Sequence, residues 1–321
     1  MTNYQFVSLW TIENIVIIAV NIFAMTTGYL MNDKKIKYLR VWDVIVQTSF
    51  WAPVMAAIVF VFGGFDLSVK LLVESIFPVL LGRYWYVTAY IVMMIVAPFI
   101  NLGFQRLPQL TIKKILALLV ILSVSVGFLG KMFLESGYSA GWLITMYAVG
   151  GYIKKFTSTS SFNTYKLLLV WVTMALISSI GEFGSHLIGN VGLKHFISYV
   201  SPIVVVESLS AFILFVKLEV RNHLFKQVIS RISPLTFGAY LINGSVFYEF
   251  LANKNVWMMN YNVGLTIAKL LAFTVLMYIV FLIMEYARNK LFALLHVNDL
   301  MMKVYDGVML MFGKTLSRFV V

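Results

Sequence analysis

Long apolar runs separated by short polar connections follow one another along the whole chain. Each run is close to the roughly 20 residues that a helix needs to cross about 30 Å of hydrocarbon. Lipid offers no partner for open backbone groups, and a closed barrel would instead show alternating segments of about ten residues. The pattern therefore predicts an all-α fold, a polytopic transmembrane helical bundle with about nine membrane-spanning helices. The predicted spans lie near residues 11–31, 42–62, 84–102, 115–134, 139–153, 167–188, 197–216, 234–252 and 262–286.

Two segments differ from this pattern. Residues 66–80 are apolar, but they are short and carry three charged side chains, Asp66, Lys70 and Glu74. A short interfacial helix or a re-entrant piece is predicted there. After Glu285, apolar residues at helical spacing are mixed with charged residues. This tail is predicted to be an amphipathic helix that lies on the membrane surface.

Composition supports a membrane protein. Hydrophobic residues make up 61% of the chain and charged residues only 12%, well beyond the apolar share of a soluble domain. No stretch is long enough for a separate soluble domain, so residues 1–321 are predicted to form a single membrane domain. The chain has no cysteine, which excludes disulfides, thiolate metal sites and cysteine nucleophiles. Its four histidines are scattered, so no metal centre is expected.

The formal net charge of +12 is distributed unevenly between the connections. Nineteen of the 25 Lys and Arg residues follow the first, third, fifth, seventh and ninth runs, five lie in the other loops, and Lys269 lies within the ninth run. By the positive-inside rule, the first group is cytoplasmic. We therefore expect the C-terminus inside and, with nine crossings, the N-terminus outside. The charge is a topology signal, and no nucleic-acid partner is expected.

An outside N-terminus without a cleavable signal is unusual, and residues 1–33 contain no Lys or Arg. The interpretation that follows is that one crossing is missing at the front. The alternative is that residues 66–80 form a full span, but the later loops would then invert and the charge sorting would fail.

Five short segments carry a resemblance to a known family. They are "VNIFAMTTGYLM", "RYWYVTAYIVMMIVAPFI", "GWLITMYAVGGYIKK", "YVSPIVVVESLSAFILF" and "SPLTFGAYLINGSVF", in this order between about residues 15 and 290. In their order and spacing the chain resembles bacterial membrane acyltransferase family 3, the integral-membrane polysaccharide O-acetyltransferases. The resemblance implies transfer of an acyl group from acetyl-CoA, or another acyl-CoA, to a hydroxyl of a cell-surface polysaccharide or glycan. It also implies a multi-pass protein of the bacterial plasma membrane with the acyl-CoA as co-substrate and no bound cofactor.

The chain departs from the family at two places. Members of the family begin with a helix that bears an Arg and, some ten residues later, a His thought to be catalytic, and no such helix precedes the "TTGYL" segment here. The histidine of the family's "YliH" segment is replaced by Asn243. Both the charge sorting and the resemblance therefore predict a chain shortened at its N-terminus. Three functions stay open: an O-acyltransferase, a glycan exporter or carrier, and an inactive truncated homologue, and no catalytic residue is assigned.

Candidate acceptor residues come from the predicted outer face. The C–H faces of sugars stack on aromatic rings, while Arg and Tyr can hydrogen-bond hydroxyl groups. Arg83 and Trp85 also fall on the family's "yW" segment. An interfacial aromatic belt explains several of the same aromatic residues. The candidate acceptor residues are Arg83, Trp85, Tyr86, Tyr138, Tyr147, His186, His195 and Asn243.

Charged residues give two further predictions. Glu207 lies near the middle of an apolar run, where a carboxylate costs about 2.5–3.5 kcal/mol, so it should face the bundle interior. Lys269 is its candidate partner, or it extends to the membrane surface instead. If the two residues pair, a functional and a structural pairing are equally open. Basic residues of the cytoplasmic loops are candidate contacts for the donor's phosphates, or are topology determinants alone. These candidates are Lys34, Lys35, Lys154 and Lys155.

Overall fold

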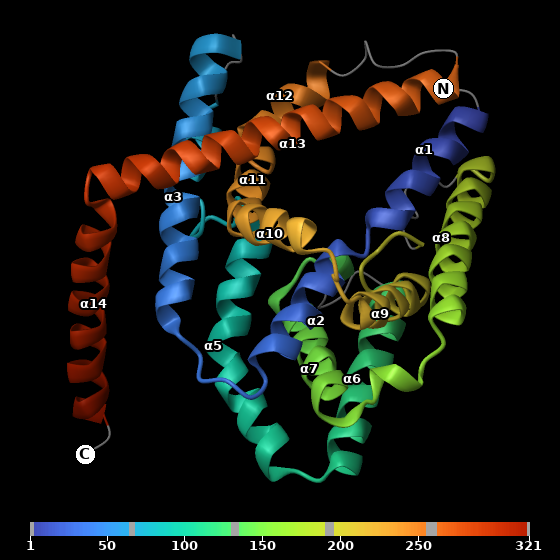
Figure 1. Cartoon of the computed structure of the whole chain (residues 1–321), viewed down its shortest axis with the longest axis horizontal. Coiled ribbons are helices and arrows are strands. Elements are labelled where there is room, and N and C mark those ends of the chain that lie inside the picture. The colour runs from blue at the N-terminus through green and yellow to red at the C-terminus, as the bar shows by residue number, and fades with distance from the viewer. Residues whose placement is uncertain (1–2, 64–67, 130–134, 190–195, 255–261, 320–321) are drawn as a thin grey trace. The chain divides into compact units, whose positions relative to one another are not determined.

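The structure, a computed structural model, describes residues 3–63, 68–129, 135–189, 196–254 and 262–319 (Figure 1). Within these ranges every regular element is a helix and no strand occurs. The prediction of an all-α helical bundle is therefore confirmed.

Six helices in the described ranges are long and apolar enough to cross a membrane. The first combines α1 (Asn3–Val16) with α2 (Ala19–Met31) as the span Val7–Met31. These helices account for six of the nine predicted spans, and the number nine is not confirmed beyond them. The other five are α3 (Tyr38–Gly63), α5 (Trp85–Arg106), α6 (Gln109–Leu129), α8 (Thr164–Leu187) and α13 (Val263–Leu294).

The fifth and seventh runs form shorter helices, α7 (Ala140–Phe156) and α9 (Pro202–Lys217). At 1.5 Å per residue these 17 and 16 residues measure about 25 Å, less than the usual hydrocarbon thickness. Both helices bury about half of their residues against neighbouring helices. A helix enclosed by protein does not need to match the lipid thickness along its own length.

The eighth run is two helices, α11 (Thr236–Asn243) and α12 (Val246–Lys254), rather than one span. The Ser245 hydroxyl donates to the Ile242 carbonyl at 2.7 Å and accepts from the Phe247 amide at 3.1 Å. The Tyr84 hydroxyl donates to the Leu241 carbonyl at 2.8 Å. Backbone groups released by the break are thus satisfied by side chains, which is what a membrane interior requires.

The two unusual segments are helical. Residues 66–80 contain the eight-residue α4 (Val69–Ile76), whose N-terminus is capped by Ser68, so this segment is too short to be a full span. Asp66 lies outside the described residues. The tail contains α14 (Val297–Phe319). That these two helices lie at the membrane surface stays a prediction.

By its contacts the chain divides into two compact units. Unit 1 comprises Met1–Ile36 and Trp85–Glu219, and unit 2 comprises Lys37–Tyr84 and Val220–Val321. Each unit is built from two separate chain segments, so neither is a contiguous stretch of sequence. The prediction of a single domain over residues 1–321 stays a prediction.

In unit 1, α2 and α7 lie side by side and their backbones touch (Figure 1). A Cβ added to Gly28 would lie 1.9 Å from the Tyr147 carbonyl oxygen, and one added to Gly150 would lie 2.0 Å from the Met25 carbonyl oxygen. Only glycine fits at either position. Small residues that let two backbones meet are a common basis of helix packing in membranes.

Candidate functional site

The first, third, fifth and seventh runs are parallel in unit 1. At one end Asn21 of α2 bonds to Trp142 of α7. At the other end, the carbonyl of Met31 in α2 accepts a hydrogen bond from Asn101 of α5 at 3.0 Å. Tyr29 of α2 meets Phe212 of α9 near their C-terminal ends, with ring centroids 5.8 Å apart. This arrangement agrees with the charge sorting, which requires these four runs to cross in one direction.

An aromatic cluster, Trp85, Tyr86, Tyr138 and Tyr199, lies at the N-terminal end of these helices. The Trp85 ring centroid is 4.7 Å from that of Tyr138 and 5.9 Å from that of Tyr199. Tyr138 and Tyr199 are 4.9 Å apart, and Tyr86 packs edge-on to Trp85 at 5.7 Å. Tyr138 is 45% exposed, so the cluster can be reached from outside the unit. Three of the eight candidate acceptor residues are thus brought together.

The loop before α7 sets the position of the cluster. Gly137 has φ +92°, and a Cβ there would lie 2.6 Å from the Cβ of Tyr199. A side chain at residue 137 would therefore displace Tyr199 as well as strain the backbone. Ser139 then caps α7 by accepting a hydrogen bond from the Trp142 amide at 3.3 Å.

A buried amide, that of Asn21, connects the aromatic cluster to the surrounding helices. The Asn21 side chain, fully buried, donates to the Tyr199 carbonyl at 3.1 Å and to the Ser208 hydroxyl at 3.0 Å. Its oxygen accepts a hydrogen bond from the Trp142 indole at 2.7 Å. Asn21 thereby joins α2, α7, α9 and the backbone of a cluster residue. Sequence reasoning missed both Asn21 and Tyr199.

Three other candidates lie elsewhere or outside the described residues. Tyr147 is fully buried and donates to the Asn101 side chain at 3.0 Å, so its hydroxyl joins α7 to α5. His186 lies in the last turn of α8. His195 lies outside the described residues. Acceptor roles for these residues stay predictions.

The candidate donor contacts lie at the opposite end of unit 1. Lys34 and Lys35 follow α2, and Lys154 and Lys155 occupy the last turn of α7. The Lys154 ammonium lies 4.8 Å from the centroid of the Tyr29 ring. Lys155 donates to the Phe104 carbonyl. These four cations thus lie near the C-terminal ends of α2 and α7, away from the aromatic cluster.

In unit 2, Arg83 is held by two carboxylates. One terminal nitrogen of its guanidinium is 2.5 and 2.6 Å from the oxygens of Glu249, and the other is 3.6 Å from Glu74. Only 12% of the Arg83 side chain is exposed. Arg83 is therefore paired in charge with residues of α4 and α12, and an acceptor role for it stays a prediction.

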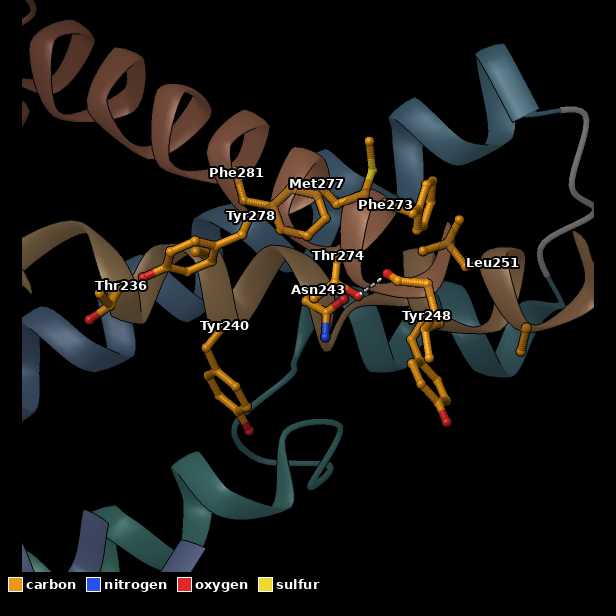
Figure 2. A pocket seen from close by; sticks show the side chains of 13 residues that line it. Thr236, Tyr240, Asn243, Tyr248, Leu251, Phe273, Thr274, Met277, Tyr278 and Phe281 are labelled. Atoms are coloured by element: carbon orange, nitrogen blue, oxygen red, sulfur yellow. Dashed lines mark hydrogen bonds between the residues drawn. The ribbon is translucent and has the colours of Figure 1, made fainter. Parts of the chain in front are cut away.

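A cavity of about 430 Å³ lies between α11, α12 and α13. Figure 2 shows Asn243 among its lining side chains, with Tyr240 and Tyr248 on either side. The hydroxyl groups of Thr236 and Thr274 donate to the Ser233 and Leu270 carbonyls, so they can only accept a hydrogen bond from a ligand. The remaining lining residues are Ala239, Leu251, Ala252, Leu270, Phe273, Met277, Tyr278 and Phe281.

A buried ion pair was missed by sequence reasoning. Glu285 and Arg288, one turn apart on α13, are 0% and 6% exposed and are joined by contacts of 2.5 and 3.0 Å. The Trp51 indole donates to Glu285 at 2.6 Å. A Cβ on Gly238 of α11 would lie 2.2 Å from the Glu285 carboxyl group. Arg288, counted from sequence among the topology cations, is therefore a structural cation that helps join α3, α11 and α13.

Glu207 is fully buried in α9, as expected, and the Trp171 indole of α8 is the hydrogen-bonding group that faces its carboxylate. Lys269 is partly exposed on α13. The two residues belong to different units. Their pairing stays a prediction.

Comparison with known proteins gives one match. A family model described as "Acyltransferase domain" matches residues 1–286. No curated protein and no solved structure matches the chain.

Proposed function

The chain belongs to this acyltransferase family, and from that premise we propose that it is an O-acyltransferase of the bacterial plasma membrane. The acyl donor is acetyl-CoA or another acyl-CoA on the cytoplasmic side, where the C-terminus also lies. The acceptor is a hydroxyl group of a cell-surface glycan. In the reaction the hydroxyl oxygen bonds to the acyl carbon, the thioester bond breaks, and the hydroxyl proton leaves with the thiolate as free CoA.

The separation of two kinds of side chain between the ends of unit 1 carries this proposal. Trp85, Tyr138 and Tyr199 at one end offer ring faces and a phenol to a sugar. Lys154 and Lys155 at the other end offer positive charge to the phosphates of CoA. A donor and an acceptor that approach from opposite sides of a membrane need this arrangement.

Transfer of radiolabel from acetyl-CoA to glycan in membranes that contain the protein tests the proposal. We expect Trp85→Ala and Tyr138→Ala to raise the KM for the glycan about 2- to 12-fold, since an aromatic contact is worth about 0.5–1.5 kcal/mol. Tyr165→Ala is the matched control, because this tyrosine is 79% exposed on α8 of the same unit. Transport of unmodified glycan without label transfer would favour an exporter, and neither activity would favour an inactive homologue.

The donor end is tested in the same assay. We expect K154Q/K155Q to raise the KM for acetyl-CoA and leave the KM for glycan unchanged. Lys113 and Lys114 are exposed cations of α6 in the same unit, so K113Q/K114Q is the control for loss of two charges. Equal effects of the two double variants would contradict a phosphate contact at α7.

A further inference from the structure

The helix α10 (His223–Ile232) has a complete division between apolar and polar residues. At 100° per residue, its five apolar side chains fall within an arc of about 140°. Its five polar side chains fall within an opposite arc of the same width. The apolar residues are Leu224, Phe225, Val228, Ile229 and Ile232, and the polar residues are His223, Lys226, Gln227, Ser230 and Arg231.

No described residue of unit 2 covers the apolar face of α10. Leu224 is 71% exposed, Phe225 57% and Val228 49%, and every residue from 221 to 231 is exposed. At ten residues the helix is far too short to span a bilayer. It is nevertheless well formed, with the Asn222 side chain accepting a hydrogen bond from the Phe225 amide at 3.1 Å. A capped helix with an open apolar face requires an apolar surface to cover it.

The charges of α10 indicate the chemistry of that surface. Lys226 and Arg231 lie on opposite borders of the apolar arc, and Arg221 precedes the helix. No acidic residue occurs in the sequence between Glu219 and Glu249. Cations at both borders can extend to phosphates while the apolar side chains enter the acyl region. The loop follows the seventh run, whose C-terminal end lies on the cation-rich side of the protein.

We propose that α10 lies in the plane of the membrane surface and binds the head groups of anionic phospholipids. Its apolar face enters the boundary between head groups and acyl chains, and Arg221, Lys226 and Arg231 contact lipid phosphates. The short helix Ser233–Leu235 joins α10 directly to α11. Bound lipid thereby fixes the depth at which α11 begins, and with it the depth of the cavity that contains Asn243. This inference concerns the membrane contact and is independent of the proposed acyl transfer.

Single-cysteine variants test the inference, because the chain has no cysteine of its own. V228C on the apolar arc and Q227C on the polar arc are spin-labelled in the full-length protein. The protein is placed in nanodiscs of phosphatidylcholine alone or of equal parts phosphatidylcholine and phosphatidylglycerol. We expect the V228C label to be accessible to oxygen and protected from a water-soluble nickel complex, with the reverse for Q227C. Equal accessibility of both labels to the nickel complex, or exclusion of both reagents from V228C, would overturn the proposal.

The charge arm uses R221Q/K226Q/R231Q. Each cation near an anionic surface increases the equilibrium constant for membrane binding about fivefold. Three cations together therefore shift the equilibrium for insertion of α10 about 100-fold. We expect this variant to lose the protection of V228C that phosphatidylglycerol adds, and to match the parent protein in phosphatidylcholine. The control R106Q/K113Q/K114Q removes three cations elsewhere and should leave V228C unchanged. An equal response of the two triple variants, or none from either, would contradict specific binding of anionic lipid at α10.

Discussion

At two glycines of unit 1, a single methyl group would decide whether two helices can meet. A Cβ added to Gly28 or Gly150 would lie within 2.0 Å of a carbonyl oxygen of the facing helix, closer than any real Cβ approaches. The neighbouring atoms are backbone, so they cannot move aside as a flexible side chain can. The contact between α2 and α7 therefore depends on both positions.

We expect Gly150→Ala to lower the free energy of unfolding by about 1–3 kcal/mol, the usual cost of overpacking. Unfolding in mixed detergent micelles, followed by circular dichroism, measures the change. Gly184→Ala on α8 is the control, because nothing lies within 4 Å of a Cβ there. The control should be neutral or stabilising, since alanine favours helix. Equal destabilisation by both variants would show that the backbone contact is not the cause.

The pair Glu285–Arg288 gives a second expectation for single residues. Glu285→Gln removes the carboxylate that pairs directly with the buried Arg288 guanidinium, so we expect a loss of about 3–5 kcal/mol in the free energy of unfolding. The double variant E285L/R288M removes both charges and should be less destabilised than E285Q. A double variant as unstable as E285Q would mean that steric packing, and not the uncompensated charge, dominates the cost.

Sequence reasoning predicted part of the candidate site. Trp85, Tyr86 and Tyr138 were predicted as acceptor residues, and the structure brings them together, although an acceptor role is untested. Asn21 was missed because its partners, Trp142 and Ser208, are 121 and 187 residues away and no local pattern marks such a network. The Glu285–Arg288 pair had a local signal, an acid and a base three residues apart at the end of an apolar run.

At the scale of elements, the hydrophobic pattern located helices better than it located their ends. The eighth run looked continuous because apolar residues continue across Gly244 and Ser245. Hydrogen bonds from the Ser245 and Tyr84 hydroxyls stabilise the break between α11 and α12, and a hydropathy pattern contains no information about them. The amphipathic helix α10 lies outside the predicted spans, in a loop whose cations indicate only topology at the level of the sequence.

The break between α11 and α12 gives a testable consequence. Tyr84→Phe removes the hydrogen bond to the Leu241 carbonyl and nothing else, so we expect a loss of about 0.5–1.5 kcal/mol in the free energy of unfolding. Tyr248→Phe removes a hydroxyl from a side chain that is 63% exposed in the same unit, and it should change stability little. The same unfolding measurement compares the two. No difference between them would mean that water or lipid satisfies the carbonyl equally well.

At the scale of the whole molecule, the sequence predicted the fold class and the family, and both are confirmed. Apolar composition and motif order are properties of the entire chain. A wrong interpretation of a single residue therefore does not change the predicted fold class or family. The division into two units was not predicted, because each unit joins residues from distant parts of the chain.

Absolute orientation is the prediction at this scale. Labelling of intact cells with a membrane-impermeant thiol reagent should modify Y138C, and should modify K35C and S160C only after the cells are opened. The reason is that Tyr138 lies at the aromatic end of the parallel helices of unit 1, and the other two lie at the cationic end. Labelling of K35C and S160C in intact cells would reverse the orientation and with it the assignment of donor and acceptor sides.

The backbone contact at Gly28 and Gly150 also limits how the protein can move. Two helices that touch at their main chains cannot slide by a residue or roll past each other without a collision. We therefore expect α2 and α7 to move as one rigid body, so spin-label distances between them should stay the same when substrates are added. Any conformational change that admits a substrate would then occur in the helices around this pair.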